Sequence, residues 1–122
     1  MKNQKDPGNR VLLVEDEPLT VEALASILEM EGYEIQAAYD GSTGLDMLRS
    51  APPPCLVLLD LDLPIIDGRE FLRIQKRDWR IANIPVIVIT GSASPAAPEA
   101  SAVLSKPVDV PTLLALMADY CH

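Results

Sequence analysis

Four short apolar runs, each ending at a polar or charged residue, limit the folds that this chain can adopt. The runs occupy residues 11–14, 56–59, 86–89 and 103–104. Continuous runs of Val, Leu and Ile, without alternating polar residues, are typical of strands that are buried on both faces, as in a parallel sheet. Aromatic residues make up only 4% of the chain, which also favours an aliphatic core of this kind.

The segments between these runs carry helical patterns. The predicted helices span residues 18–31, 42–50, 69–76 and 109–117, and a weaker strand covers residues 34–39. In the first helix we expect Leu24, Ile27 and Leu28 to form the apolar face. Ser42 and Asp109 are the predicted N-caps of the second and last helices. Strands that alternate with helices in this way predict one doubly wound α/β domain, with helices on both faces of a parallel sheet.

Polar side chains stand at the ends of four of the predicted strands. These residues are Glu15, Asp16, Asp60, Thr90 and Lys106. In open α/β sheets, ligands bind outside the carboxyl ends of the strands, so we expect these side chains to share one pocket. Three neighbouring carboxylates repel one another, and a hard cation such as Mg²⁺ relieves that repulsion. Together with an amine and a hydroxyl, they supply the groups needed for phosphoryl transfer to an aspartate.

Charge and composition argue against several classes of function. The net charge of −8 disfavours direct binding of nucleic acid, which requires clustered Lys and Arg. No apolar run approaches the length of a membrane span, so we expect a cytoplasmic protein without a membrane partner. Cys55 and Cys121 show no metal-binding or redox spacing, and we expect two reduced thiols.

The strand ends form four sequence motifs. They are VLLVEDEP (11–18), LVLLDLDLPIIDG (56–68), IPVIVITG (84–91) and LSKPVD (104–109). Together they resemble the receiver domain of bacterial two-component response regulators, of the chemotaxis-regulator-like kind. The resemblance implies a flavodoxin-like fold, with five parallel strands in the order 2-1-3-4-5. Residues 1–9 are polar and are expected to form a flexible leader, and the resemblance covers nearly the whole chain after residue 9, so residues 10–122 would be the receiver domain.

By position, the resemblance implies a role for each polar residue. Asp60 matches the phosphoacceptor, and Thr90 and Lys106 match the residues that contact the phosphoryl group. The metal-binding positions, which imply Mg²⁺ as cofactor, are matched by Glu15, Asp16, Asp60 and the backbone carbonyl of Asp62. The implied partners are a histidine kinase or histidine phosphotransfer protein and an unidentified downstream protein. Such a domain is a signalling module, not an enzyme, and catalyses only its own phosphorylation and dephosphorylation.

The segment from residue 90 to residue 106 departs from the pattern of the family. It is several residues shorter than usual and contains Pro95 and Pro98, which oppose a regular helix. We therefore expect the fourth helix of the family to be shortened or missing. Val103 replaces the usual switch aromatic and is expected to pack in the core, while Glu99-Ala100 stands where a Gly-Ala pair is common. These departures predict a different output face.

Two local features also follow from the resemblance. The peptide bond between Lys106 and Pro107 is expected to be cis. Only peptide bonds that precede proline adopt the cis form at a modest cost in free energy. The Asp62 side chain is expected to point outward beside the entrance to the site, where its charge would slow reaction with anionic phosphodonors.

Two alternatives belong to other functional classes. Asp60-Leu61-Asp62 also resembles the DxD motif of haloacid-dehalogenase-like phosphatases. In that family, however, the motif follows the first strand, whereas two strands precede it here, and Glu15 and Asp16 would have no role. The second alternative is an adaptor that keeps the receiver fold and does not depend on phosphorylation, against which the complete set of strand-end residues argues.

Overall fold

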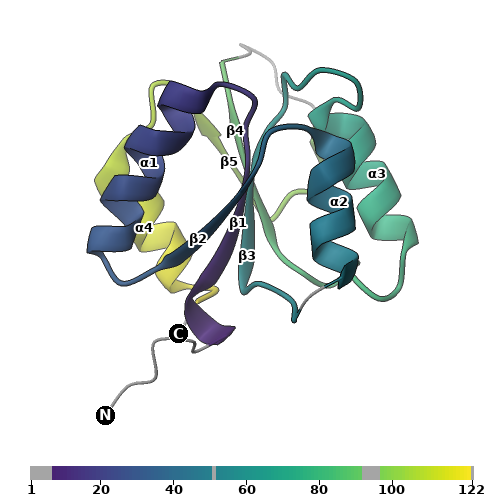
Figure 1. Cartoon of the computed structure of the whole chain (residues 1–122), viewed down its shortest axis with the longest axis horizontal. Coiled ribbons are helices and arrows are strands. Elements are labelled where there is room, and N and C mark those ends of the chain that lie inside the picture. The colour runs from purple at the N-terminus through teal and green to yellow at the C-terminus, as the bar shows by residue number, and fades with distance from the viewer. Residues whose placement is uncertain (1–6, 51, 92–96, 122) are drawn as a thin grey trace.

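The fold is an open parallel sheet with helices on both faces (Figure 1). The computed structural model describes residues 7–50, 52–91 and 97–121, so residues 1–6 of the predicted leader lie outside them. The strands are β1 (Arg10–Val14), β2 (Glu34–Ala38), β3 (Leu56–Asp60), β4 (Val86–Thr90) and β5 (Ala102–Ser105). The helices are α1 (Pro18–Met30), α2 (Gly41–Ser50), α3 (Gly68–Arg77) and α4 (Val110–Ala118), preceded by a 3-10 turn at Pro7–Asn9. The strands are parallel in the order β2-β1-β3-β4-β5, which confirms the predicted topology.

Each face of the sheet is covered by two helices. Helices α1 and α4 lie on one face, and α2 and α3 lie on the other (Figure 1). In β1, Val11 and Leu13 point into the α1/α4 core, whereas Leu12 and Val14 point into the α2/α3 core. Because both faces bury apolar side chains, the central strands need continuous apolar runs, and each residue of β3 and β4 is buried.

Aspartates cap three of the turns that start helices. Asp67 accepts a hydrogen bond from the backbone N–H of Glu70, and Asp109 caps α4 as predicted. The prediction that Ser42 caps α2 is wrong, because the helix starts at Gly41. Asp40 has this role instead, since its carboxylate accepts from the backbone N–H of Thr43 at 2.7 Å and from the Thr43 hydroxyl.

The connection between β4 and β5 has no helix among its described residues, 91 and 97–101. Residues 98 and 99 form a turn there, and residues 92–96 lie outside the described part. This confirms that the fourth helix of the family pattern is shortened or missing, and α4 of this structure is the C-terminal helix.

The prediction that Val103 packs in the core is wrong. Val103 is 39% exposed, although its neighbours Ala102 and Leu104 pack against the α1/α4 core. Strand β5 is the edge of the sheet, and successive side chains of a strand point to opposite faces. No helix of the described residues covers the face of β5 to which Val103 points.

The prediction of two reduced thiols is also wrong, because Cys55 and Cys121 form a disulfide. The two residues are 66 positions apart in sequence, and their Cα atoms are 5.3 Å apart. Cys55 directly precedes β3, whereas Cys121 follows α4, so the chain topology alone brings them together. Their spacing in sequence carries no sign of this pairing.

The longest helix in the described part of the chain, α1, has 13 residues. None of the described helices combines the length and the apolar character that crossing a bilayer requires.

Candidate functional site: an acidic pocket at the carboxyl edge of the sheet

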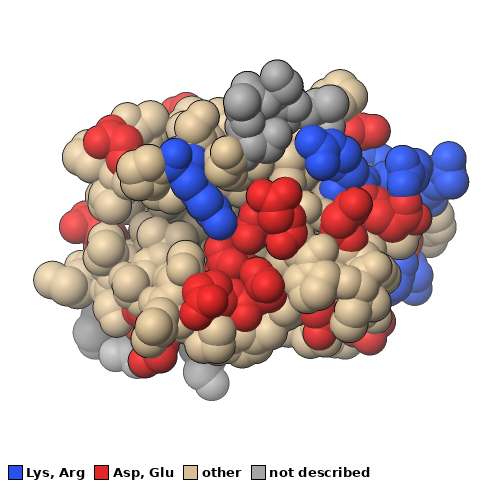
Figure 2. Space-filling view, turned by 90° about the horizontal axis from the view of Figure 1, so that it is seen from above, with Lys and Arg blue, Asp and Glu red and all other residues tan. Residues whose placement is uncertain are grey.

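The parallel strands bring the predicted site residues to one edge of the sheet. Glu15 and Asp16 follow β1, Asp60 ends β3, and Thr90 ends β4. Seen from above this edge, Figure 2 shows acidic side chains gathered near the centre of the molecule with a basic side chain beside them. Glu15 and Asp60 are each 5% exposed and Thr90 is fully buried, whereas Asp16 is exposed. One edge thus combines buried and solvent-facing acids.

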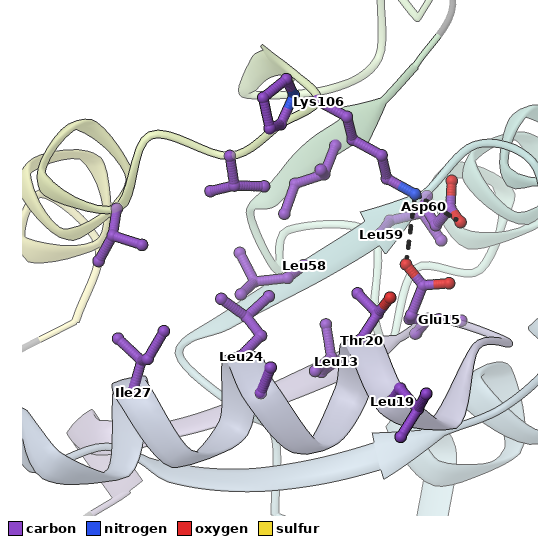
Figure 3. A pocket seen from close by; sticks show the side chains of 16 residues that line it. Leu13, Glu15, Leu19, Thr20, Leu24, Ile27, Leu58, Leu59, Asp60 and Lys106 are labelled. Atoms are coloured by element: carbon purple, nitrogen blue, oxygen red, sulfur yellow. Dashed lines mark hydrogen bonds and ion pairs between the residues drawn. The ribbon is translucent and has the colours of Figure 1, made fainter.

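Lys106 joins the two buried carboxylates. Its ammonium nitrogen lies 3.3 Å from Oδ2 of Asp60 and 3.4 Å from Oε1 of Glu15 (Figure 3). The backbone N–H of Lys106 donates to the carbonyl of Thr90 at 2.8 Å, and this hydrogen bond anchors Lys106 to the end of β4. The peptide bond between Lys106 and Pro107 is cis, as predicted.

Burial and neighbouring charges shift the pKa values in the pocket. Burial raises the pKa of Glu15, and the Asp60 carboxylate raises it further, against the lowering effect of the Glu17 backbone N–H and of Lys106. Burial would lower the pKa of Lys106, but the combined effect of Asp60 and Glu15 raises it. The lysine is therefore a stable cation, whereas the acids are crowded and not fully neutralised.

The three acids fit a divalent cation. One carboxylate oxygen from each of Glu15, Asp16 and Asp60 lies within 4.8 Å of the others. Three ionised carboxylates and one ammonium leave a formal charge of −3 + 1 = −2, so a divalent cation would neutralise the pocket. Oxygen donors of this kind are those that Mg²⁺ prefers. The residues present therefore fit Mg²⁺.

The loop between β3 and α3 is held close to Asp60. The backbone N–H of Asp62 donates to Oδ1 of Asp60 at 3.0 Å, and the Asp62 side chain is exposed, as predicted. Gly68 donates its N–H to the carbonyl of Leu61 at 2.9 Å. A Cβ at Gly68 would lie only 2.5 Å from Cα of Leu61 and 2.8 Å from the carbonyl oxygen of Asp60, so only glycine allows this close return of the chain.

A groove of about 450 Å³ opens beside the acidic pocket. Its walls come from α1 and from residues 106–110, and Figure 3 shows Leu19, Leu24 and Ile27 projecting into it from α1. Leu24 and Leu28 of the predicted apolar face of α1 are buried, whereas Ile27, on the same face, is 37% exposed and lines this groove. The groove is largely apolar, but Asp60 and Lys106 line one end of it.

Sequence reasoning did not identify this groove. The only available signal was that Leu19 lies outside the apolar stripe formed by Leu24 and Leu28. Leu19 is 73% exposed, and together with Ile27 it leaves apolar surface uncovered along this groove.

Comparisons with known proteins agree with the geometry. The chain matches the family model of the response regulator receiver domain over residues 11–118. The polar-differentiation response regulator DivK of Brucella ovis is 32% identical over 116 residues, which cover 90% of this chain and 94% of DivK.

Longer proteins and solved structures match as well. The alkaline phosphatase synthesis transcriptional regulatory protein SphR of Synechococcus elongatus is 35% identical over 92 residues, which cover 69% of this chain and 35% of SphR. The chain thus spans about a third of the length of this relative. The structure of the response regulator protein TrrA of Thermotoga maritima, in complex with Mg²⁺ and BeF, superposes with a TM-score of 0.83 at 27% identity, covering 92% of this chain and 98% of that chain.

The family model extends from β1 to the last residue of α4 and includes all the strand-end residues described above. The haloacid-dehalogenase-like alternative therefore does not hold. The chain belongs to the receiver domain family of two-component response regulators, whose members are signalling domains.

Proposed function

We propose that Asp60 accepts a phosphoryl group in a Mg²⁺-dependent reaction and that this domain thereby switches the binding of a partner. The observation that carries the proposal is the contact of Lys106 with both Asp60 and Glu15. A lysine held there stands beside the carboxylate that would be modified. The acids Glu15 and Asp16 are placed to share a cation with it.

In the proposed reaction, a carboxylate oxygen of Asp60 attacks the phosphorus atom of a phosphohistidine. The bond from phosphorus to the imidazole nitrogen breaks, and its electron pair leaves with the imidazole. Glu15, Asp16, Asp60 and the backbone carbonyl of Asp62 would hold Mg²⁺, whose positive charge would offset the negative charge of the phosphoryl oxygens. Lys106 would turn from the carboxylates to a phosphoryl oxygen, and Thr90 would donate its hydroxyl to another.

The groove beside Asp60 supports a protein as the phosphodonor. It presents apolar side chains from α1 and ends at Asp60 and Lys106. An amphipathic helix of a histidine kinase or histidine phosphotransfer protein would place apolar residues in such a groove and its histidine next to Asp60. Since such donors work inside the cell, the proposal includes a cytoplasmic location.

The output step is expected to differ from that of receivers with a switch aromatic. In a receiver with a switch aromatic, the ring turns inward when the hydroxyl residue moves. Val103 has no ring, is branched at Cβ and is already exposed, so it cannot follow a movement of Thr90 in this way. We propose that the signal passes through residues 91–99 or through α1. Backbone NMR shifts with and without beryllofluoride would locate the response.

The test is Mg²⁺-dependent phosphorylation. The wild-type domain is incubated with acetyl phosphate and Mg²⁺ or with EDTA, and the product is measured by intact mass spectrometry. We expect a single added phosphoryl group with Mg²⁺, none with EDTA, and none in Asp60→Asn, which keeps the size of the side chain. If the domain remains unmodified with acetyl phosphate and with a set of phosphorylated histidine phosphotransfer proteins, the phosphorylation-independent adaptor becomes the correct description.

A further inference from the structure

Basic residues are concentrated on and just after α3. Five of the ten Lys and Arg residues of this chain lie within residues 69–80, although the net charge of the whole chain is −8. They are Arg69, Arg73, Lys76, Arg77 and Arg80. In Figure 2, basic side chains gather on the right, which is the side on which α3 lies in Figure 1. This charge does not take part in the acidic pocket.

A hollow lies at the C-terminal end of this basic segment. Its volume is about 570 Å³, and its lining residues are Arg49, Ile74, Arg77, Asp78, Trp79 and Arg80. Trp79 is the only tryptophan of the chain and is 84% exposed. Tryptophan and arginine are both enriched among the residues that contribute most to binding energy at protein interfaces. We call this set of six residues the Trp79 surface.

An ion-pair network holds the arginines of the Trp79 surface in place. Asp78 accepts from Nε of Arg49 at 2.9 Å and from Nη2 of Arg80 at 2.9 Å. The Arg80 and Arg49 guanidinium groups hold the pKa of Asp78 well below its usual range. The pair from Arg49 also ties the end of α2 to the end of α3. Both guanidinium groups are thus fixed before any partner arrives.

Hydrogen bonds from two side chains of α3 hold the loop that carries Trp79 in place. Gln75 is fully buried and donates from Nε2 to the carbonyls of Ile81 at 2.9 Å and Ile84 at 3.0 Å. Lys76 donates to the carbonyl of Ala82 at 2.9 Å. Since Ile81 and Ile84 fill the core beneath this loop, the indole of Trp79 remains outside. Such preorganisation lowers the entropy cost of binding.

The charge of the Trp79 surface selects the partner. Arg77 is exposed and forms no ion pair with any residue in the described part of the chain, so it can pair with an incoming carboxylate. Trp79 and Ile74 offer apolar contact area beside it. Carboxylates at Glu70 and Asp78 interrupt the positive charge, which opposes the regular phosphate array of a nucleic acid.

We propose that the Trp79 surface binds an acidic protein segment, in which carboxylates pair with the arginines and an apolar side chain packs on Trp79. In a parallel sheet the helices run back from the carboxyl edge, so the end of α3 lies at the opposite edge from Asp60 (Figure 1). A partner held here would leave the acidic pocket accessible. The inference is therefore independent of phosphorylation at Asp60.

Trp79 provides the measurement. The probe is a synthetic peptide of glutamates around a Leu-Phe pair, with the glutamine version of the same peptide as its control. We expect a saturable change in Trp79 fluorescence with the glutamate peptide only, weakened by salt. Arg77→Gln should weaken binding roughly fivefold to tenfold, whereas Arg10→Gln, which removes the same charge elsewhere, should not. By calorimetry, Trp79→Ala should weaken binding and Tyr39→Ala, another exposed aromatic, should not.

Other results would overturn the proposal. They are an absent fluorescence change, equal binding of the glutamine peptide, tighter binding of a single-stranded oligodeoxynucleotide, or self-association that protects Trp79 as protein concentration rises. A far-ultraviolet circular dichroism spectrum and a melting temperature equal to those of the wild type would show that Arg77→Gln is folded.

Discussion

The ammonium nitrogen of Lys106 lies 3.3 Å from Oδ2 of Asp60, although the two residues are 46 positions apart in sequence. Because Lys106 also contacts Glu15, it partly compensates two of the three acids that would hold Mg²⁺. The lysine and the metal therefore compete for the same negative charge before phosphorylation. Removal of either group should change the affinity of the site for the other.

Lys106→Gln should increase the affinity of the pocket for Mg²⁺. The variant removes a cation that lies next to two carboxylates, so the metal should bind several-fold more tightly. Asp16→Asn should have the opposite effect and weaken Mg²⁺ binding by about tenfold or more, equivalent to about 1.4 kcal/mol. Titration with Mg²⁺, followed by NMR shifts of residues at the carboxyl edge, measures both constants. Weaker Mg²⁺ binding in Lys106→Gln would mean that the lysine supports the metal and does not compete with it.

Mg²⁺ should stabilise the domain more at neutral pH than at acidic pH. Burial raises the pKa of Glu15 above its ordinary value of 4.5, so the fold favours its protonated form. The stability that protonated Glu15 contributes is present below the ordinary pKa of a glutamate. This stability is lost as pH rises through the higher pKa that Glu15 has in the folded state.

The melting temperature is measured with and without Mg²⁺ at about pH 5 and about pH 7. We expect a larger gain from Mg²⁺ at the higher pH, where the Glu15 carboxylate is ionised to a greater extent. In Glu15→Gln the gain should be smaller and should depend less on pH. A gain that is the same at both pH values in the wild type would contradict the role given to Glu15.

Asp62→Asn should react faster with acetyl phosphate. The Asp62 side chain is exposed beside Asp60, where its charge opposes the approach of an anionic donor. The expected increase is roughly twofold to fivefold at low salt and should diminish as ionic strength rises. Phosphorylation rates at two salt concentrations measure this effect, with Glu22→Gln on the exposed side of α1 as a control of equal charge change. A rate equal to that of the wild type at low salt would rule out electrostatic control by Asp62.

Reduction of the Cys55–Cys121 disulfide should destabilise the domain. The bond closes a loop of 66 residues, and the chain-entropy model gives about 4 kcal/mol for a loop of this length. Urea unfolding with and without a reducing agent measures the loss. Cys55→Ser/Cys121→Ser should be as stable as the reduced wild type and insensitive to the reducing agent. Identical urea midpoints for the oxidised and reduced wild type would show that the bond adds no stability.

Much of the fold was predictable from the sequence, because a strand buried on both faces must be apolar along its whole length. The runs over residues 11–14, 56–59 and 86–89 satisfy that condition, and the polar residues that end them mark the carboxyl edge. Since parallel strands share that edge, Asp60 and Lys106 could be placed in one pocket before any contact was known.

The sequence failed where burial depends on a neighbour that is distant along the chain. Val103 is apolar, as core residues are, but β5 is an edge strand. No described helix covers the face of β5 to which Val103 points. Ile27 fits the helical stripe of α1 but lines an open groove.

Other features depend on the spatial meeting of segments. The Cys55–Cys121 disulfide exists because the end of α4 lies next to the start of β3. No local sequence pattern predicts this proximity. The Trp79 surface likewise required α2 to bring Arg49 to Asp78. Periodicity reports which way a side chain points within its own strand or helix. Which residues pack against that side chain is determined only by the tertiary structure of the whole chain.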